Sequence, residues 1–332
     1  MFKTTNSLPM NQLPTAKPHI SSAAQLAPYV GRYRAMLTGV DASLEARLNQ
    51  PKARAPEPFG HIVAEYDAVL LDAYGVLTHG VQAIPGAPQR VSALRRAGKQ
   101  VRVLSNNANQ APTTVLAGLR RQGFDFTAEE LITSGMAVRP FLQQSAHQQQ
   151  TQLWIGIEEG RTAYAPAAID SAEGAASVLM CSDKSFFGGP QQQQAEALLA
   201  RAPQAPILLA NPDLVVVTVE GGFYPVSGYT AALLSEAYGA PLVGIGKPFA
   251  PAFDLALSTL RGVARNRVLM VGDSLETDIL GARAAGIDCC LTLSGVAGLI
   301  ARTLPGGWAE LCDQRSVWPD HVTPDIGADA AA

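Results

Sequence analysis

Three charged residues of this chain stand at the ends of short apolar runs, in positions suited to chemistry. Asp72 follows residues 68–71 directly, and Lys247 and Asp273 follow similar runs after one intervening glycine. Runs this short are typical of buried parallel strands rather than helices. Because the carboxyl ends of parallel strands share one edge of a sheet, we expect these side chains to meet although they are far apart in the chain.

The carboxylates of this group are suited to a metal ion. Asp278 stands in the segment that follows Asp273, where it supports the pair formed by Asp72 and Asp273. Carboxylate oxygens are hard ligands, and Mg²⁺ is bound in proteins by a few of them while it keeps several waters. We therefore predict a Mg²⁺ site at this edge of the sheet.

Groups suited to phosphate accompany the carboxylates. Ser105 and Asn106 follow another strand-like run, 101–104, and offer short hydrogen-bonding side chains, while Lys247 offers a cation. A phosphoryl group with developing charge requires such partners. A carboxylate beside a metal and a bound phosphate can attack phosphorus and form an aspartyl-phosphate that water hydrolyses. Each residue alone also fits a structural role, such as a helix cap or a surface lysine, but their order along the chain favours the chemical interpretation.

Strand-like and helical segments alternate around these residues, which predicts an α/β fold with a doubly wound, Rossmann-like parallel sheet. We place the first part of this core in residues 61–135 and the second part in residues 231–312. The second part is expected to contain a strand at 241–245 and to end with a strand at 288–293. The sequence pattern of residues 136–230 differs from that of the two core parts, and we interpret these residues as a smaller inserted α/β domain.

Both ends of the chain lie outside this predicted core. Residues 1–60 are interpreted as an N-terminal extension that has helical spacing from Ser22 onward. Residues 1–21 are rich in Pro, Ser, Thr and Asn and are expected to lack stable structure. Residues 313–332 are polar and end in alanines, so we expect a C-terminal tail that frays or folds over the surface.

The composition is that of an ordinary globular enzyme. Of the 332 residues, 47% are hydrophobic and 16% are charged, and the formal net charge is −3. Without a long basic block or an apolar run of membrane-spanning length, nothing indicates nucleic acid or a membrane as partner. The four cysteines lack metal-ligand spacing and are predicted to be buried free thiols in a reducing compartment. We expect a cytoplasmic protein, with an organelle transit peptide as a minor alternative because the N-terminus is poor in acidic residues.

Four strand ends carry the residues described above: Asp72, then Ser105 and Asn106, then Lys247, then Asp273. In this order they resemble the four motifs of the haloacid dehalogenase-like (HAD) hydrolase superfamily. The long insert between the second and third motifs looks like subfamily IIA, whose C2-type cap occurs in p-nitrophenylphosphatase-like and nucleotidase-like phosphatases. The resemblance extends over residues 66–298 and implies that residues 136–230 form such a cap over the active site. Further stretches fit this subfamily: V-Q-A-I-P-G-A (81–87), L-I-T-S-G-M-A (131–137), A-N-P-D (210–213), G-F-Y-P-V-S-G (222–228) and V-G-I-G-K-P (243–248).

The resemblance implies a metal-binding role for several matching residues. Asp72 would be the nucleophile and a Mg²⁺ ligand, and Asp273 would be the second carboxylate ligand. The residue at position 74, here Tyr74, would donate its backbone carbonyl to the metal. Asp278, with Ser274 beside it, would orient ligands or waters around the ion.

The resemblance also implies how substrate is held. Ser105, Asn106 and Lys247 would bind the phosphate of a small phosphorylated metabolite. Asn211 and Asp213 would contact the substrate or stabilise the junction between core and cap. Caps of this kind often support dimers, so a homodimer formed through the cap is a further expectation.

Tyr74 departs from the pattern of the superfamily's phosphatases. These usually read D-x-D in the first motif, and the second Asp protonates the leaving group and then activates water. A phenol gives up its proton only near pH ~10, and general acid–base help is worth ~10²–10⁴-fold. Hydrolysis is therefore expected to be slow, or limited to good leaving groups, unless another residue assists. His79 is the nearest candidate in sequence, although a solvated loop histidine is the simpler interpretation.

Three functions stay open, in a definite order. A Mg²⁺-dependent phosphatase-type hydrolase ranks first, and a catalytically weak phosphate-ligand-binding protein ranks second. A C–halogen hydrolase ranks third, because D-A-Y-G also resembles the first motif of the dehalogenases themselves, in which Asp attacks carbon without a metal. Against this third function, Asp273 and Asp278 look like the metal-binding form of the last motif. Those dehalogenases also carry their cap between the first two motifs.

Overall fold

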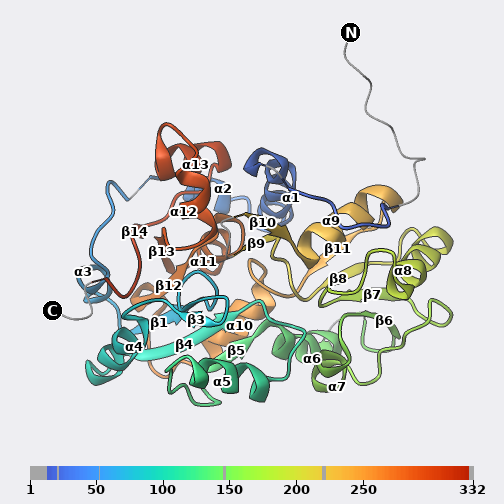
Figure 1. Ribbon diagram of the computed structural model, residues 1–332, viewed down its shortest axis with the longest axis horizontal. Coiled ribbons are helices and arrows are strands. Elements are labelled where there is room, and N and C mark those ends of the chain that lie inside the picture. Colours follow the sequence, from blue (N-terminus) through green and yellow to red (C-terminus); the bar gives the residue numbers. More distant parts are fainter. Residues whose placement is uncertain (1–12, 21, 52, 145–146, 219–221, 329–332) are drawn as a thin grey trace, which may run out of the picture.

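Two parallel sheets, one of six strands and one of four, organise the part of the chain that the computed structural model describes, residues 13–20, 22–51, 53–144, 147–218 and 222–328. The larger sheet lies on the left in Figure 1 and the smaller on the right, with helix α1 above the region between them. A parallel sheet needs a helical crossover between its strands, and the alternation seen in the sequence supplies these crossovers.

The larger sheet has the order β14-β13-β12-β1-β4-β5. Its strands are β1 (Ala68–Leu71), β4 (Gln100–Ser105), β5 (Leu131–Thr133), β12 (Val268–Gly272), β13 (Asp288–Thr292) and β14 (His321–Thr323). Its helices and turns are α3 (Phe59–Val63), α4 (Ala87–Arg96), α5 (Pro112–Arg121), α10 (Ala250–Ser258), η2 (Arg265–Arg267), η3 (Leu275–Ile279), α11 (Leu280–Ala285), α12 (Val296–Ala301) and α13 (Gly307–Arg315).

Strand β1 is central and is buried on both faces. Val69 and Leu71 belong to an apolar cluster with residues of α3, α4 and α5, whereas Leu70 belongs to another cluster with residues of α10 and α11. Successive strand side chains point to opposite faces, so a continuous apolar run is what a sheet covered by helices on both sides requires. The predicted doubly wound α/β fold is confirmed.

The smaller sheet has the order β11-β8-β7-β6. Its strands are β6 (Gln152–Ile155), β7 (Ser177–Met180), β8 (Ile207–Leu209) and β11 (Leu242–Gly244), and its helices are α6 (Ser134–Gln144), α7 (Glu158–Tyr164), α8 (Pro190–Arg201) and α9 (Ser227–Tyr238). The placement of the strand 241–245 in the core is wrong, because β11 pairs with β8 in parallel register. An apolar run of this length would serve either sheet, so only its pairing distinguishes them.

The C-terminal region is part of the larger sheet rather than a tail. Strand β14 pairs with β13, so the expectation that residues 288–293 form the last strand is wrong. Helix α13 packs on α12, and buried Val317, Val322 and Ile326 join the apolar clusters. The extreme C-terminus, residues 329–332, lies outside the described residues.

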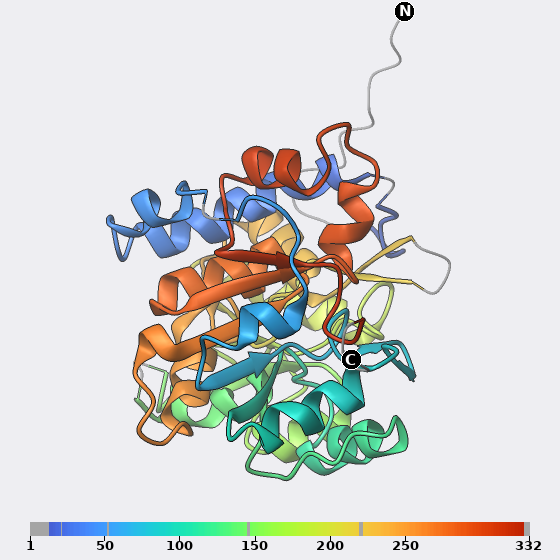
Figure 2. The same cartoon turned by 90° about the vertical axis from the view of Figure 1, so that its left-hand side faces the viewer.

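The N-terminal region packs on both sheets. It forms η1 (Ala23–Leu26), α1 (Ala27–Thr38) and α2 (Leu44–Leu48), in agreement with the predicted helical extension. Residues 13–20 pack on the fold, because Leu13 and Ile20 are buried, Leu13 N donates to Glu196 of α8, and Ile20 forms a bridge with Phe223. The expectation that this stretch lacks stable structure is therefore wrong. The same expectation for residues 1–12 and 21 lies outside the described residues. Figure 2 shows α1 and α13 together along one edge of the molecule.

Two antiparallel hairpins complete the fold close to the strand ends. They are formed by β2 (Thr78–His79) with β3 (Gln82–Ala83) and by β9 (Val215–Val217) with β10 (Phe223–Pro225). The four cysteines are buried and unpaired, as predicted. In the described part of the chain, no helix is long and apolar enough to cross a membrane.

Candidate active site

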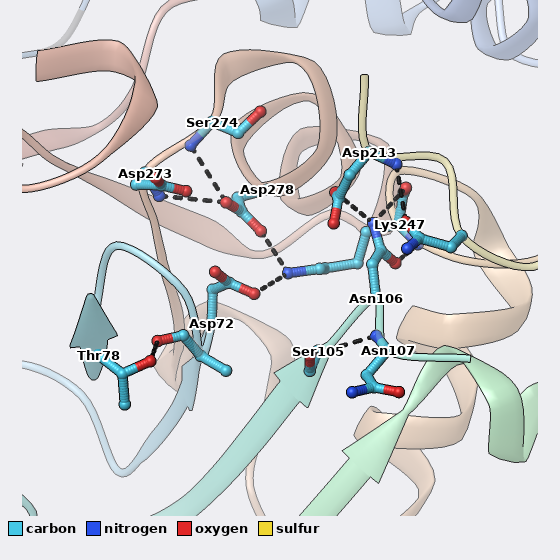
Figure 3. Close-up of polar contacts among 12 residues, drawn as sticks. Asp72, Thr78, Ser105, Asn106, Asn107, Asp213, Lys247, Asp273, Ser274 and Asp278 are labelled. Carbon is cyan, nitrogen blue, oxygen red and sulfur yellow. Dashed lines mark hydrogen bonds and ion pairs between the residues drawn. The ribbon is translucent and has the colours of Figure 1, made fainter. Parts of the chain in front are cut away.

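Asp72 follows the carboxyl end of β1 and lies at the predicted edge of the larger sheet. Its backbone N–H continues the ladder by donating to the carbonyl of Val271, at 2.9 Å. One carboxylate oxygen, Oδ1, accepts a hydrogen bond from Lys247 Nζ at 2.6 Å (Figure 3). The other oxygen, Oδ2, is not used by this ion pair. Asp72 is only 8% exposed, so the pair is largely desolvated.

Lys247 reaches Asp72 from the opposite sheet. It follows β11 of the smaller sheet rather than a core strand, and its side chain is 1% exposed. Its Nζ also donates to Asp278 Oδ1 at 2.6 Å. Burial alone would lower the pKa of Lys247, but Asp278 and Asp72 outweigh this effect and raise the pKa. The lysine is therefore a fixed cation between two carboxylates.

Asn106 fixes the backbone that carries Lys247. Its Oδ1 accepts from Lys247 N at 2.8 Å, and its Nδ2 donates to Lys247 O at 3.1 Å. The amide of Asn106 thus binds both backbone groups of Lys247 and joins the end of β4 to the smaller sheet. Ser105 precedes it on β4, and its Oγ accepts a hydrogen bond from Asn107 N at 3.3 Å.

Asp273 lies in the turn between β12 and η3, and Asp278 lies within η3 itself. Asp278 Oδ2 accepts from the backbone N–H groups of Asp273, at 3.1 Å, and Ser274, at 3.2 Å. This contact leaves no room for a side chain at Gly272, where a Cβ would lie 2.1 Å from Asp278 Cβ. Asp273 Oδ2 accepts from Val296 N at 2.7 Å, so the start of α12 holds that carboxylate in place.

The carboxylates fit a divalent cation. Asp72, Asp273 and Asp278 each offer one oxygen, and these oxygens lie within 4.8 Å of one another. Burial raises the pKa of Asp72 to about 7, with Lys247 opposing and Asp278 adding to the shift. Burial and repulsion from Asp72 raise the pKa of Asp273 well above its usual range. A hard divalent cation would relieve this repulsion, and an all-oxygen donor set suits Mg²⁺.

Asp213 joins the site, but Asn211 does not line it. The Asp213 side chain lines the same pocket as Asp72, and its Oδ1 accepts from Asn106 Nδ2 at 2.8 Å. Burial raises the pKa of Asp213 to about 6, although Lys247 and Asn106 oppose the shift. Asn211 Oδ1 accepts from the backbone N–H of Asp213 at 3.0 Å, so Asn211 shapes the turn that presents Asp213.

Tyr74 lines the pocket, but its phenol extends to the β2–β3 hairpin. The side chain is 38% exposed, and a Cβ built on Gly80 would lie 3.6 Å from the Tyr74 hydroxyl. His79 is exposed on the same hairpin, with its Nε2 2.6 Å from the carbonyl of Ser294, and it does not line the pocket. Among the described residues, the first motif therefore contributes no carboxylate or histidine that could replace the second Asp of the usual D-x-D motif as acid and base.

Sequence reasoning missed the apolar side of the pocket. The free space at the centre of the pocket is small, about 40 Å³. Its additional lining residues are Leu26, Leu214, Val215, Val216, Glu276, Thr277 and Val296. Glu276 and Thr277 lie in the sequence between Ser274 and Asp278, which were both predicted as site residues. Their position in the pocket could therefore have been predicted from the last motif. The sequence could not place Leu26 in the pocket. An apolar residue on one face of a predicted helix shows only that the face is buried, not which part of the protein it packs against.

Comparison with known proteins agrees with this geometry. The haloacid dehalogenase-like hydrolase family matches residues 69–169, and a HAD-hydrolase-like family matches residues 244–328. Chronophin from Homo sapiens is 30% identical over 252 residues, which cover 72% of this chain and 84% of chronophin. The chain belongs to the haloacid dehalogenase-like hydrolases. This HAD chain is also 29% identical to an acid sugar phosphatase from Staphylococcus epidermidis, over 70% of the chain and 88% of that protein.

Solved structures place the HAD chain among capped phosphatase folds. A glycerol phosphate phosphatase from Mycobacterium tuberculosis, crystallised with magnesium, is 26% identical with a TM-score of 0.65, covering 83% of this chain and 80% of that one. A p-nitrophenyl phosphatase from Archaeoglobus fulgidus shares the fold at 22% identity and a TM-score of 0.68, covering 80% and 99%. The predicted superfamily, with its subfamily IIA neighbours, and the hydrolase class are confirmed.

Proposed function

We propose that this HAD protein is a Mg²⁺-dependent phosphatase that hydrolyses a small phosphorylated metabolite through an aspartyl-phosphate on Asp72. The observation that supports it most strongly is the convergence of Asp72, Lys247, Asp273 and Asp278 from two sheets into one buried cluster. The names of its relatives, which include sugar and glycerol phosphate phosphatases, support the same reaction. In this proposal the larger sheet is the catalytic core and the smaller sheet belongs to an inserted cap.

The proposed Mg²⁺ ligands are the side chains of Asp72 and Asp273 and the backbone carbonyl of Tyr74. When bound, the ion would neutralise charge on the phosphoryl oxygens and on the two carboxylates. Asp278 would orient these ligands and would not bind the ion itself. Its two carboxylate oxygens already accept hydrogen bonds from Lys247 and from the backbone N–H groups of Asp273 and Ser274. It fixes the turn that aims Asp273.

The phosphoryl group is proposed to lie between Asp72 and the donors Ser105, Asn106 and Lys247. Asn106 would contribute its backbone N–H, because both N–H groups of its side chain already donate to Asp213 and to the Lys247 carbonyl. An oxygen of the Asp72 carboxylate forms a bond to phosphorus, and the ester bond breaks so that the leaving oxygen takes the electron pair. Water then attacks phosphorus, which releases inorganic phosphate and restores the carboxylate. Lys247, 2.6 Å from Asp72, stabilises negative charge throughout.

Tyr74 limits both steps. Without the second carboxylate of the usual D-x-D motif, no acid at that position protonates the leaving group and no base there activates water. We therefore propose that turnover is restricted to good leaving groups. The same substitution favours a second candidate function, a phosphate-ligand-binding protein with weak turnover, because the binding groups do not depend on the side chain at position 74.

The test is hydrolysis of p-nitrophenyl phosphate with Mg²⁺ or with EDTA, by wild type and by Asp72→Asn. A phosphatase releases phosphate only with Mg²⁺ and loses this activity in Asp72→Asn, whose folding is checked by circular dichroism. A binding protein shows saturable binding of inorganic phosphate without turnover. Halide release from a 2-haloacid without Mg²⁺ would instead support the C–halogen hydrolase. The order of the chain disfavours that third function, because the smaller sheet is inserted after β4 and β5 rather than directly after β1.

A further inference from the structure

We propose that the N-terminal segment, residues 13–57, completes the substrate pocket, and that its Leu26 limits the size of the group that substrates carry beyond phosphate. This inference rests on the proposed phosphatase function. The matched family regions begin at residue 69, so this segment precedes them. Leu26 lines the pocket together with Asp72 and is 1% exposed.

One part of the segment is attached to the smaller sheet and its hairpin. Ile20 forms an antiparallel bridge with Phe223 of β10. Lys17 Nζ lies 2.9 Å from Asp183 Oδ2 and donates to the carbonyl of Pro225 at 2.8 Å. The Lys17–Asp183 pair is largely desolvated, since the two side chains are 16% and 5% exposed, so it is a firmer attachment than a surface ion pair.

The other part of the segment is attached to the larger sheet. Helix α2 packs against α11. The carbonyl of Leu48 accepts a hydrogen bond from Trp318 N at 3.0 Å, and Glu57 N donates to the carbonyl of Val322 at 2.8 Å. Backbone hydrogen bonds of this kind do not depend on side-chain identity. The segment therefore spans the two sheets and holds the pocket between them in one arrangement.

Between these two attachments, the segment contacts the pocket itself. Tyr33 is fully buried, and its hydroxyl donates to the carbonyl of Pro212 at 2.8 Å, directly before Asp213. The ring of Tyr33 packs edge-on against Phe249, two residues after Lys247, with 5.5 Å between ring centroids. Helix α1 thus contacts both chain segments that bring smaller-sheet residues into the site.

Leu26 gives the pocket part of an aliphatic wall. The other apolar members of the wall are Leu214, Val215, Val216 and Val296. Hydroxyl or charged groups of a substrate would lose their water against these side chains without gaining hydrogen bonds from them. The part of a substrate that contacts this wall is therefore expected to be small and apolar. A hydrophobic pocket discriminates by roughly 10–200-fold for each methylene that does not fit.

The test compares Leu26→Ala with Leu48→Ala in the full-length protein. Leu48 is the matched control, because it is equally buried in the same segment but does not line the pocket. Hydrolysis of phenyl phosphate and 1-naphthyl phosphate is measured with Mg²⁺, together with calorimetric binding of phenylphosphonate and 1-naphthylphosphonate. Leu26→Ala is expected to raise the naphthyl-to-phenyl ratio about tenfold in kcat/KM and in affinity, whereas Leu48→Ala leaves both ratios unchanged.

A further variant and two outcomes decide the inference. Leu26→Phe keeps the site filled and is expected to lower the naphthyl-to-phenyl ratio, which covers the case in which Leu26→Ala does not fold. If wild type handles the phenyl compounds but the ratios of the Leu26 and Leu48 variants coincide, the inference is wrong and the proposed function stands. If wild type neither hydrolyses phenyl phosphate nor binds phenylphosphonate, the proposed function is wrong, and the inference with it.

Discussion

At the scale of single residues, the site is a charge balance that depends on one lysine. Asp72 and Asp278 both lie 2.6 Å from Lys247 Nζ, and all three side chains are nearly inaccessible to water. A buried carboxylate that loses its partner still carries the free-energy cost of desolvation. Removing one member of a buried ion pair therefore destabilises the protein far more than removing one member of an exposed pair.

The substitution Lys247→Met tests this balance. It leaves two buried carboxylates without a cation, so we expect a loss of about 3–5 kcal/mol in the free energy of unfolding without Mg²⁺, and loss of phosphate binding. Adding Mg²⁺ should restore part of the stability. Urea unfolding with and without Mg²⁺ measures both effects. Exposed Lys184→Met is the control and should change stability by less than ~0.5 kcal/mol; equal losses in the two variants would contradict the prediction.

Asp213→Asn tests the cost of an acid whose pKa is raised to about 6 by burial. The folded state binds the proton more tightly than the unfolded state, whose pKa is near ~3.9, so stability falls as pH rises between these values and stays lower above them. Asparagine avoids this cost. We expect Asp213→Asn to be more stable than wild type by roughly 1–2 kcal/mol at about pH 7.5, a figure reduced because the carboxyl is partly exposed.

The pH dependence of that difference is the decisive part. Urea unfolding at a series of pH values should show the advantage of Asp213→Asn shrinking to near zero at about pH 4, where the folded wild-type carboxyl is already protonated. A difference that stays constant across this range would mean that asparagine acts through packing instead.

At the scale of secondary structure, elements with a strong local pattern were predictable and pairing was not. β1, β4 and β12 each combine an apolar run with a polar residue after it, and the sequence places all three correctly. β11 has a similar pattern but joins the smaller sheet, because pairing depends on the tertiary positions of its neighbours rather than on its own residues. The three residues of β14 are too few to show any periodicity.

A buried ion pair lies directly before β14 and links it to α11 and β13. Arg283 of α11 donates to Asp320 Oδ1 at 3.0 Å, and Asp320 Oδ2 accepts from the backbone N–H of Cys289 at 2.9 Å. We expect Asp320→Ala to destabilise the protein by about 3–5 kcal/mol, because it leaves the Arg283 charge buried. Thermal and urea unfolding report this loss.

The exposed pair of Asp67 with Arg267 provides a control of the same chemistry. These side chains are 56% and 44% exposed. Asp67→Ala should therefore cost no more than ~1 kcal/mol. A loss for Asp320→Ala as small as that for Asp67→Ala would show that β14 is held by its backbone pairing and apolar contacts alone.

At the scale of the whole molecule, the site is assembled from segments that no local pattern connects. Asp72, Asp273 and Asp278 lie together, as their positions at or after strand ends predict. Lys247 joins them although the sheet that carries it was assigned wrongly. Leu26 could not be found, because its position depends on how the N-terminal segment crosses between the two sheets. The clustering of the charged strand-end residues was predictable from residue type and position, whereas the apolar wall was not.

Tyr74→Asp tests whether the whole assembly is a phosphatase that lacks only its acid and base. A carboxylate at this position supplies the proton transfers, so we expect kcat for phenyl phosphate to rise by roughly 10–100-fold, below the full ~10²–10⁴-fold value of general acid–base help because the surroundings are not tuned for it. Tyr74→Asn has a similar size without an acid and should show no gain. An equal gain in both variants would instead indicate that removing the phenol opens the pocket.

The central claim is that Asp72 carries the phosphoryl group, and the most direct measurement is mass spectrometry of the protein quenched in acid during turnover of p-nitrophenyl phosphate with Mg²⁺. Because no base at position 74 activates water for the second step, we expect a covalent phosphate to accumulate on the peptide that contains Asp72. The same peptide from Asp72→Asn should stay unmodified. Steady release of phosphate by Asp72→Asn at the wild-type rate, with no modified peptide in either protein, would contradict phosphoryl transfer to Asp72.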